Sequence, residues 1–175
     1  MVREDPMLIY LLRHGTAEDA GPGIRDHERA LTDEGWKKLR RAVPTWKTLC
    51  TSPDVLLVSP FRRAQETASV FVEALHCSKA MRTETCLTPE SGVQTAMSLI
   101  EAEQHSGTKI LALVGHEPHL GYLLGLLLTG HPRLPIPLKK GMLVAVETES
   151  TASLVAYLRF AVSQGAAGEL GDGLA

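Results

Sequence analysis

The segment Met7-Leu8-Ile9-Tyr10-Leu11-Leu12-Arg13-His14-Gly15 decides the fold of this chain. Its apolar part, residues 7–12, runs without interruption until it meets a charged residue. An unbroken apolar run of this kind is typical of a central strand in a parallel sheet, because helices cover both faces of such a sheet. We therefore predict an α/β fold with a strand at residues 7–12 that ends in a turn carrying Arg13 and His14.

Two more strand-like segments end in polar side chains of the same types. Residues 54–58 precede Ser59-Pro60-Phe61-Arg62-Arg63-Ala64-Gln65-Glu66-Thr67, and residues 109–114 precede Gly115-His116-Glu117-Pro118. The carboxyl ends of parallel strands lie at one edge of the sheet, which is where open α/β sheets bind ligands. Two imidazoles and at least two guanidiniums are therefore expected to meet above that edge.

The remaining apolar patterns alternate between helices and short strands. The predicted helices begin after the cap Thr32 (with Pro44 weakening or dividing the helix), at the cap Ser59-Pro60, at residue 93 and at Glu117-Pro118. Short strands are predicted at residues 80–82, 142–147 and 153–160. The last two follow each other too closely for a helical crossover, so at least one strand should be antiparallel. The expected architecture is a three-layer α/β/α fold with a mostly parallel sheet.

Length and composition favour one domain with a substantial core. The chain has 175 residues, of which 44% are hydrophobic, and we predict a single domain at residues 1–163. The segment 164–175 is rich in glycine and alanine and is predicted to be a flexible tail.

Charge and hydropathy restrict the partners and the compartment. A net charge of -2 gives no general attraction to nucleic acid or to an anionic membrane. The chain has no long apolar segment and only three cysteines, without paired spacing. We therefore expect a cytoplasmic protein with reduced thiols that binds neither nucleic acid nor membrane.

The expected cluster of arginine and histidine indicates phosphoryl transfer. Guanidinium groups match the oxygens of a phosphoryl group, and a neutral imidazole is a competent nucleophile toward phosphorus. No carboxylate group or Cys/His spacing in the cluster is typical of a metal site. The prediction is a metal-independent reaction without a cofactor, in which arginine and histidine supply the positive charge.

Each residue of the cluster has an expected role. His14 is the predicted nucleophile, and Arg13 beside it holds the phosphoryl oxygens. His116 donates a hydrogen bond to those oxygens, assisted by backbone N–H groups at the helix start, where Glu117 is a predicted phosphate-binding position. One of Arg62 and Arg63 should face the phosphate and the other solvent, and their spacing does not choose between them.

Other polar residues near these segments have weaker claims. Glu90 is the only nearby acid considered as a proton donor, although its position suits an ordinary helix-leading acid better. Lys139 and Lys140 form either a positive rim that attracts an anionic substrate or a solvated loop, with about equal support. His27 and His119 are predicted to be surface or cap residues.

These motifs together resemble the histidine phosphatase superfamily, which has the phosphoglycerate mutase-like fold. The family signature Arg-His-Gly is similar to Arg13-His14-Gly15, and two further family blocks are similar to residues 59–67 and 114–120. In the family pattern the phosphate-binding arginine directly precedes an alanine. The resemblance therefore implies that Arg63, before Ala64, is the phosphate ligand.

Softer motifs resemble the SixA-type phosphohistidine phosphatases within this superfamily. They are Ala30-Leu31-Thr32, Leu87-Thr88-Pro89 and Pro137-Leu138-Lys139-Lys140-Gly141. The resemblance implies a phosphohistidine intermediate on His14 and a substrate that is a histidine-phosphorylated signalling or phosphotransfer domain, with inorganic phosphate as product.

The short spacing between the second and third blocks bears on the substrate. Only residues 64–115 separate them, which leaves little room for a large cap insertion, so an open pocket suited to a protein substrate is expected. A leaving imidazole also needs less help from a general acid than an alkoxide does. The alternatives are a phosphatase of small phosphomonoesters and a phosphoprotein-binding module without turnover.

Overall fold

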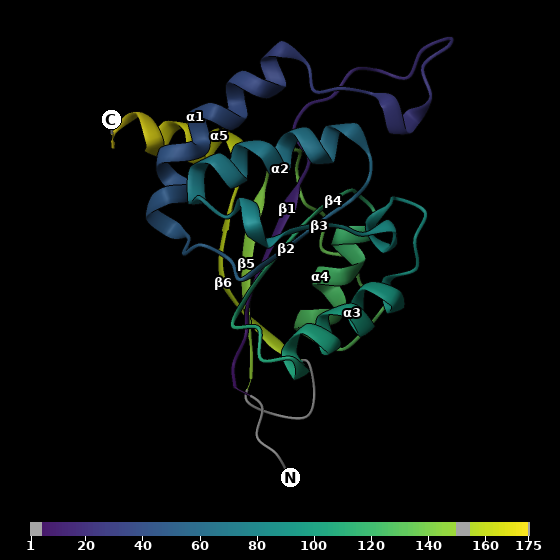
Figure 1. Cartoon of the computed structure of the whole chain (residues 1–175), viewed down its shortest axis with the longest axis vertical. Helices are drawn as coiled ribbons and strands as arrows, with labels where there is room; N and C mark the ends of the chain where they lie inside the picture. The colour runs from purple at the N-terminus through teal and green to yellow at the C-terminus, as the bar shows by residue number, and fades with distance from the viewer. Residues whose placement is uncertain (1–4, 150–154, 175) are drawn as a thin grey trace.

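A single six-stranded sheet lies at the centre of the computed structural model, which describes residues 5–149 and 155–174 (Figure 1). The strand order is β3-β2-β4-β1-β5-β6. The bounds of the strands are β1 (Leu8–Arg13), β2 (Val55–Val58), β3 (Met81–Thr83), β4 (Ile110–Gly115), β5 (Leu143–Thr148) and β6 (Ala156–Val162).

The sheet is parallel on one side of β1 and antiparallel on the other. β1 pairs in parallel with β4, β4 with β2, and β2 with β3. β5 is antiparallel to both β1 and β6. The predicted mixture of a mostly parallel sheet with antiparallel pairing is confirmed. β1 therefore has a partner on each edge, which explains its uninterrupted apolar sequence.

Helices cover both faces of the sheet and complete the expected three layers. α1, α2 and α5 lie on one face, and α3 and α4 lie on the other (Figure 1). Alternate side chains of β1 enter the two cores, with Tyr10 and Leu12 on the first face and Ile9 and Leu11 on the second. The bounds of the helices are α1 (Asp33–Leu49), α2 (Arg62–Leu75), α3 (Val93–His105), α4 (His119–Thr129) and α5 (Gln164–Asp172).

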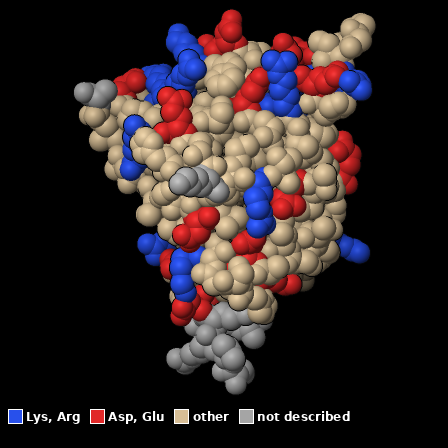
Figure 2. Space-filling view, viewed as in Figure 1, with Lys and Arg blue, Asp and Glu red and all other residues tan. Residues whose placement is uncertain are grey.

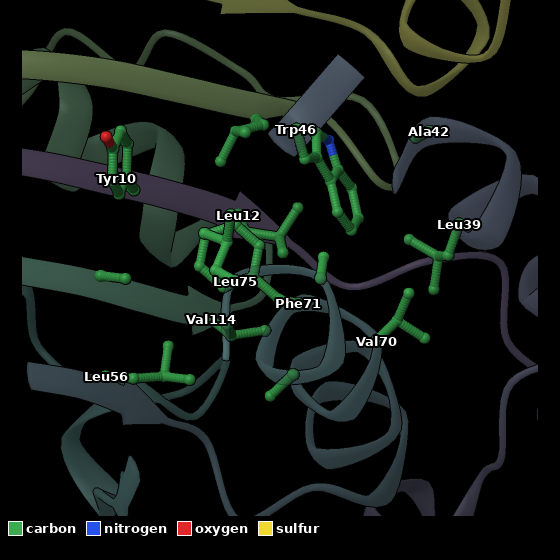
Figure 3. Close-up of a cluster of buried hydrophobic side chains, with 14 of the residues drawn as sticks. Tyr10, Leu12, Leu39, Ala42, Trp46, Leu56, Val70, Phe71, Leu75 and Val114 are labelled. Atoms are coloured by element: carbon green, nitrogen blue, oxygen red, sulfur yellow. The ribbon is translucent and has the colours of Figure 1, made fainter. Parts of the chain in front are cut away.

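Aromatic packing fixes α1 and α2 on β1. The rings of Trp46 and Phe71 meet edge to face with centroids 5.7 Å apart, and Phe71 also meets Tyr10 at 6.4 Å (Figure 3). All three side chains are almost fully buried. Such aromatic pairs add about 0.5–1.5 kcal/mol beyond the burial of their area. They hold the two helices rigidly beside the strand that leads to Arg13.

Two sequence predictions about helix boundaries are wrong. Pro44 lies inside α1 without dividing it, because Ala42 and Trp46 on either side are buried in the core. That packing outweighs the cost of one missing N–H, which is about 3 kcal/mol in an exposed helix. The N-cap of α2 is Phe61 rather than Ser59-Pro60.

The predicted flexible tail is also wrong, because residues Gln164–Asp172 form α5. The hydroxyl of Ser163 accepts a hydrogen bond from Ala166 N and caps the helix. The hydroxyl of Thr45 donates to the carbonyl of Ala167 at 2.6 Å. A Cβ added at Gly171 would lie 2.7 Å from the carbonyl oxygen of Arg41 in α1. Glycine and alanine thus allow close helix packing here.

The other expectations about the chain agree with the described residues only in part. The strand predicted at 153–160 begins at Ala156, and residues 153 and 154 lie outside the described part of the chain. Among the described residues no helix is long and apolar enough to cross a membrane. On the face shown in Figure 2, basic and acidic side chains are interspersed, so attraction of an anion has to come from a local site.

Candidate active site

Strand register brings the three sequence blocks to one edge of the sheet. Arg13, the last residue of β1, lies opposite Gly115, the last residue of β4. Val58 at the end of β2 lies opposite Val114. The residues that follow these strands therefore meet at the same level, at the carboxyl edge where ligands bind in α/β sheets.

His14 is held in one tautomer by its own backbone. Its Nδ1 lies 2.7 Å from the carbonyl oxygen of Gly15, and a carbonyl only accepts, so Nδ1 carries the proton. The lone pair is then on Nε2. Burial lowers the pKa of His14 to about 4, and the charges of Arg63 and Arg13 act in the same direction. His14 is therefore neutral and nucleophilic at neutral pH.

His116 lies beside His14, with the ring centroids 5.0 Å apart. Its Nε2 is 2.7 Å from the hydroxyl oxygen of Ser59, which also accepts a hydrogen bond from Phe61 N. When the Ser59 hydroxyl donates to Nε2, the proton of His116 is on Nδ1, which is buried without a partner in the described part of the chain. Burial lowers the pKa of His116, and the neighbouring His14 and Arg63 lower it further.

The two neighbouring arginines of α2 separate as the sequence predicts in general terms. Arg62 is exposed and pairs with Glu66. Arg63 is buried, and its guanidinium donates to the carbonyl of Asp26 at 2.6 Å and to the carboxylate of Asp26 at 2.9 Å. The geometry favours Arg63 as the one that faces the histidines, because its charge acts on the pKa of both His14 and His116.

Three buried nitrogens of the cluster have no acceptor among the described residues. They are Nε of Arg13, Nε of Arg63 and Nδ1 of His116. The Nη1 of Arg13 donates to the carbonyl of Leu138 at 2.6 Å, which fixes the guanidinium. Buried donors without acceptors are costly, and an anion with several oxygens would satisfy them. The three free donor nitrogens of the cluster therefore suit an oxyanion.

Glu117 contacts the chain backbone near Leu138. Its carboxylate accepts a hydrogen bond from Leu138 N at 3.0 Å and lies close to Gly121. Burial raises the pKa of Glu117, while the Arg13 charge lowers it. The side chain therefore positions the segment around Leu138 and the guanidinium of Arg13. The carboxylate is therefore engaged with the backbone, and phosphate binding at the backbone N–H of Glu117 stays a prediction.

The weaker candidates lie around the cluster. Glu90 is exposed in the turn before α3, and its role as an acid stays a prediction. Lys139 and Lys140 are exposed in the loop before β5, and Lys140 lies near enough for its charge to lower the pKa of His14. His27 is exposed, whereas His119 is buried, so its prediction as a surface or cap residue is wrong.

Sequence reasoning missed the residues that support the cluster. Asp26 lies in a short 3-10 helix, Asp26–Glu28, within a segment that has no apolar period to place it. Ser59 is predicted as a helix cap and as the start of the second block, but its contact with His116 through the hydroxyl is not predicted. Thr67 belongs to the second block, and its hydroxyl accepts a hydrogen bond from Gly15 N at 3.1 Å.

No group of three or more His, Cys, Asp or Glu in the described chain could hold a metal ion.

Comparison with known proteins finds similarity to histidine phosphatases. Residues 9–88 match the model of the histidine phosphatase superfamily, branch 1. The chain is 28% identical to phosphohistidine phosphatase SixA of Escherichia coli over 124 residues, which cover 71% of this chain and 76% of that protein.

Solved structures show the same fold. The protein histidine phosphatase SixA complexed with tungstate has a TM-score of 0.81 at 24% identity, covering 91% of this chain and 98% of the other. A phosphoglycerate mutase from Bacillus anthracis has a TM-score of 0.71 at 11% identity, covering 97% and 98%. The Arg-His-Gly turn at the end of β1 lies within the segment that matches the histidine phosphatase superfamily, and the chain is similar to phosphohistidine phosphatase SixA.

Proposed function

We propose that this protein is a metal-independent phosphohistidine phosphatase that acts through a covalent intermediate on His14. The observation that carries the proposal is the neutral His14, whose Nδ1–H is bound to the Gly15 carbonyl while Nε2 is free for attack. The match of residues 9–88 to the histidine phosphatase superfamily supports a phosphatase. The 28% identity to SixA of Escherichia coli supports phosphohistidine as the substrate.

In the first step Nε2 of His14 attacks the substrate phosphorus in line. The P–Nε2 bond forms, the bond from phosphorus to the substrate imidazole breaks, and the leaving nitrogen takes a proton from solvent water. The Gly15 carbonyl stabilises the positive charge that develops on the His14 ring. Arg13, Arg63 and His116 donate from their unpartnered nitrogens to the phosphoryl oxygens, where charge increases in the transition state.

In the second step water attacks phosphorus and loses a proton to solvent, and the P–Nε2 bond breaks with its electron pair returning to Nε2. Inorganic phosphate leaves and His14 returns to its neutral form, which its low pKa favours. The Nδ1–H of His116 and the guanidinium of Arg63 stay on the phosphoryl oxygens throughout, so that both steps use one set of donors. A leaving imidazole needs less help from a general acid than an alkoxide does, so the proposed reaction does not depend on the predicted role of Glu90 as an acid.

The test is release of phosphate from a histidine-phosphorylated protein domain and from a small phosphomonoester, each in the presence of EDTA. We expect the phosphohistidine substrate to be preferred and the His14→Ala variant to be inactive. His131→Ala is the matched control, because His131 is exposed and lies in the loop after α4.

Trapping the intermediate separates the alternatives. Rapid quenching should give acid-labile phosphate on wild-type protein and none on His14→Ala. Preference for the ester would indicate a small-molecule phosphatase instead. Binding of the phosphoprotein without turnover or labelling would indicate a binding module, and the proposed function would then be wrong. The predicted cytoplasmic location is a separate expectation.

A further inference from the structure

A second group of unpartnered donors lies beside the cluster, in a cavity of about 530 Å³. The cavity lies between α1, the loop before β5 and the start of α5. Arg13 forms one wall, so the cavity is continuous with the candidate active site. Its other cationic lining residues are Lys38, Arg41, Lys139 and Lys140.

A buried amide gives this cavity a built donor. Gln164 lines the cavity with only 8% of its surface exposed, and its Nε2 has no hydrogen-bond partner in the described chain. Gly141, which has a φ of +66°, makes room for it, since a Cβ there would lie 2.5 Å from Gln164 Cδ. An unpartnered buried N–H costs free energy unless a bound acceptor satisfies it.

Some of the cationic side chains around the Gln164 amide already form ion pairs, and others do not. Arg41 already binds Asp172, with its Nε 3.0 Å from both carboxylate oxygens, and Lys38 pairs with Glu34 at 3.3 Å. Lys139 and Lys140 have no hydrogen bond or ion pair from their side chains to any described residue, and both are exposed. The free donors are therefore these two lysines and the Gln164 amide.

The loop that carries the lysines is tied to the nucleophile. The N–H of Gly141 donates to the carbonyls of Arg13 and His14, at 3.1 and 3.0 Å. Lys140 is close enough that its charge contributes to the lowered pKa of His14. A group bound by Lys139, Lys140 and Gln164 would therefore lie on the same substrate molecule as the phosphoryl group.

We propose that Lys139, Lys140 and Gln164 form a second oxyanion subsite that binds carboxylate side chains flanking the phosphohistidine of a protein substrate. The proposal rests on the proposed function and adds the class of substrate that the site selects. A carboxylate is an acceptor with two oxygens, which matches an amide N–H and two ammonium groups. The net charge of -2 makes such local attraction necessary for an acidic partner.

The experiment compares two peptides with a single phosphohistidine, one flanked by glutamate and the other by glutamine. We expect kcat/KM of the wild type to favour the acidic peptide about tenfold, and the preference to shrink at high salt. The ratio of kcat/KM for the acidic peptide to that for the glutamine peptide should fall to a value between about 1 and about 3 in Lys139→Gln/Lys140→Gln. It should also fall in Gln164→Leu. Lys37→Gln/Lys47→Gln removes the same charge from exposed positions of α1 and should keep the wild-type ratio.

Binding measurements keep the proposal testable without turnover. Fluorescence anisotropy of the same peptides without phosphate should show tighter binding of the acidic one to wild type, and the lysine variant should lose this difference. If neither peptide is hydrolysed but this difference is present, the proposed function fails and the subsite stands.

Two results would overturn the subsite. One is an equal affinity and an equal kcat/KM for the two peptides in the wild type. The other is a preference that persists in both Lys139→Gln/Lys140→Gln and Gln164→Leu. A sugar bisphosphate tests the same oxyanion chemistry on a small molecule. If it inhibits more strongly than the corresponding sugar monophosphate, and the two peptides do not differ, the assignment of the subsite to carboxylates is also overturned.

Discussion

Acid should destabilise this protein through His14 before it inactivates the site. The side chain is only 7% exposed, and burial lowers its pKa from 6.5 to about 4. The unfolded chain therefore binds a proton on this residue at a pH where the native state does not. Because the folded pKa is the lower one, stability falls as pH decreases through 6.5, and the loss is complete below about 4.

The magnitude follows from the two pKa values. With a pKa of 6.5 in the unfolded chain and about 4 in the folded protein, His14 lowers the unfolding free energy by about 2 kcal/mol as the pH falls from about 6.5 to about 4.5. His14→Asn removes this titration and leaves an amide that can donate to the Gly15 carbonyl. The difference in unfolding free energy between wild type and this variant should therefore change by about 2 kcal/mol over the same pH range.

Urea unfolding in phosphate-free buffers of constant ionic strength measures this difference. Fluorescence of the buried Trp46 reports the transition. His131→Asn is the control, because its side chain is exposed and its removal should leave the pH dependence of wild type. Parallel loss of stability in wild type and His14→Asn would refute the argument that His14 is held neutral by burial.

Four further perturbations have defined outcomes. Ser59→Ala should lower the unfolding free energy by about 1–3 kcal/mol in a urea titration and lower kcat/KM about tenfold, because Nε2 of the buried His116 loses its partner; unchanged values of both would contradict this. Gly35→Ala should cost more than about 2 kcal/mol, since the new Cβ would lie 2.1 Å from the carbonyl oxygen of Thr16. Gly165→Ala, where nothing lies within 4 Å, should be neutral or should stabilise α5 by up to about 1 kcal/mol in the same urea titration. EDTA should leave the rate of phosphate release unchanged, and a loss that a divalent ion restores would contradict the role of arginine and histidine as the source of positive charge.

The sequence predicted the central strands because their environment leaves a simple pattern. β1 and β4 have neighbours on both edges and helices on both faces, so each reads as an unbroken apolar run. The polar residues at their ends then follow from the geometry of a parallel sheet. In the structure Arg13 lies opposite Gly115, so the ends of the two runs meet at one level of the sheet.

Contacts over long sequence distances left no such pattern. α5 was missed because its glycines and alanines carry little hydrophobic signal, although they allow it to pack on α1. Pro44 predicts a weakened or divided helix, and tertiary packing keeps this helix undivided. Asp26 binds Arg63 from a segment without periodicity, and nothing in the spacing of Arg62 and Arg63 showed which of them turns inward.

The unpredicted contacts are also the ones that explain the chemistry. Three buried donors without acceptors and a histidine with a lowered pKa make the site costly in the absence of an anion. Hydrogen bonds of the surrounding backbone hold the site in place despite this cost. The Thr67 hydroxyl accepts from Gly15 N, and the Gly141 N–H donates to the carbonyls of Arg13 and His14. Because the same hydrogen bonds fix the nucleophile and present Lys140, affinity for an anion and readiness for attack have one structural origin.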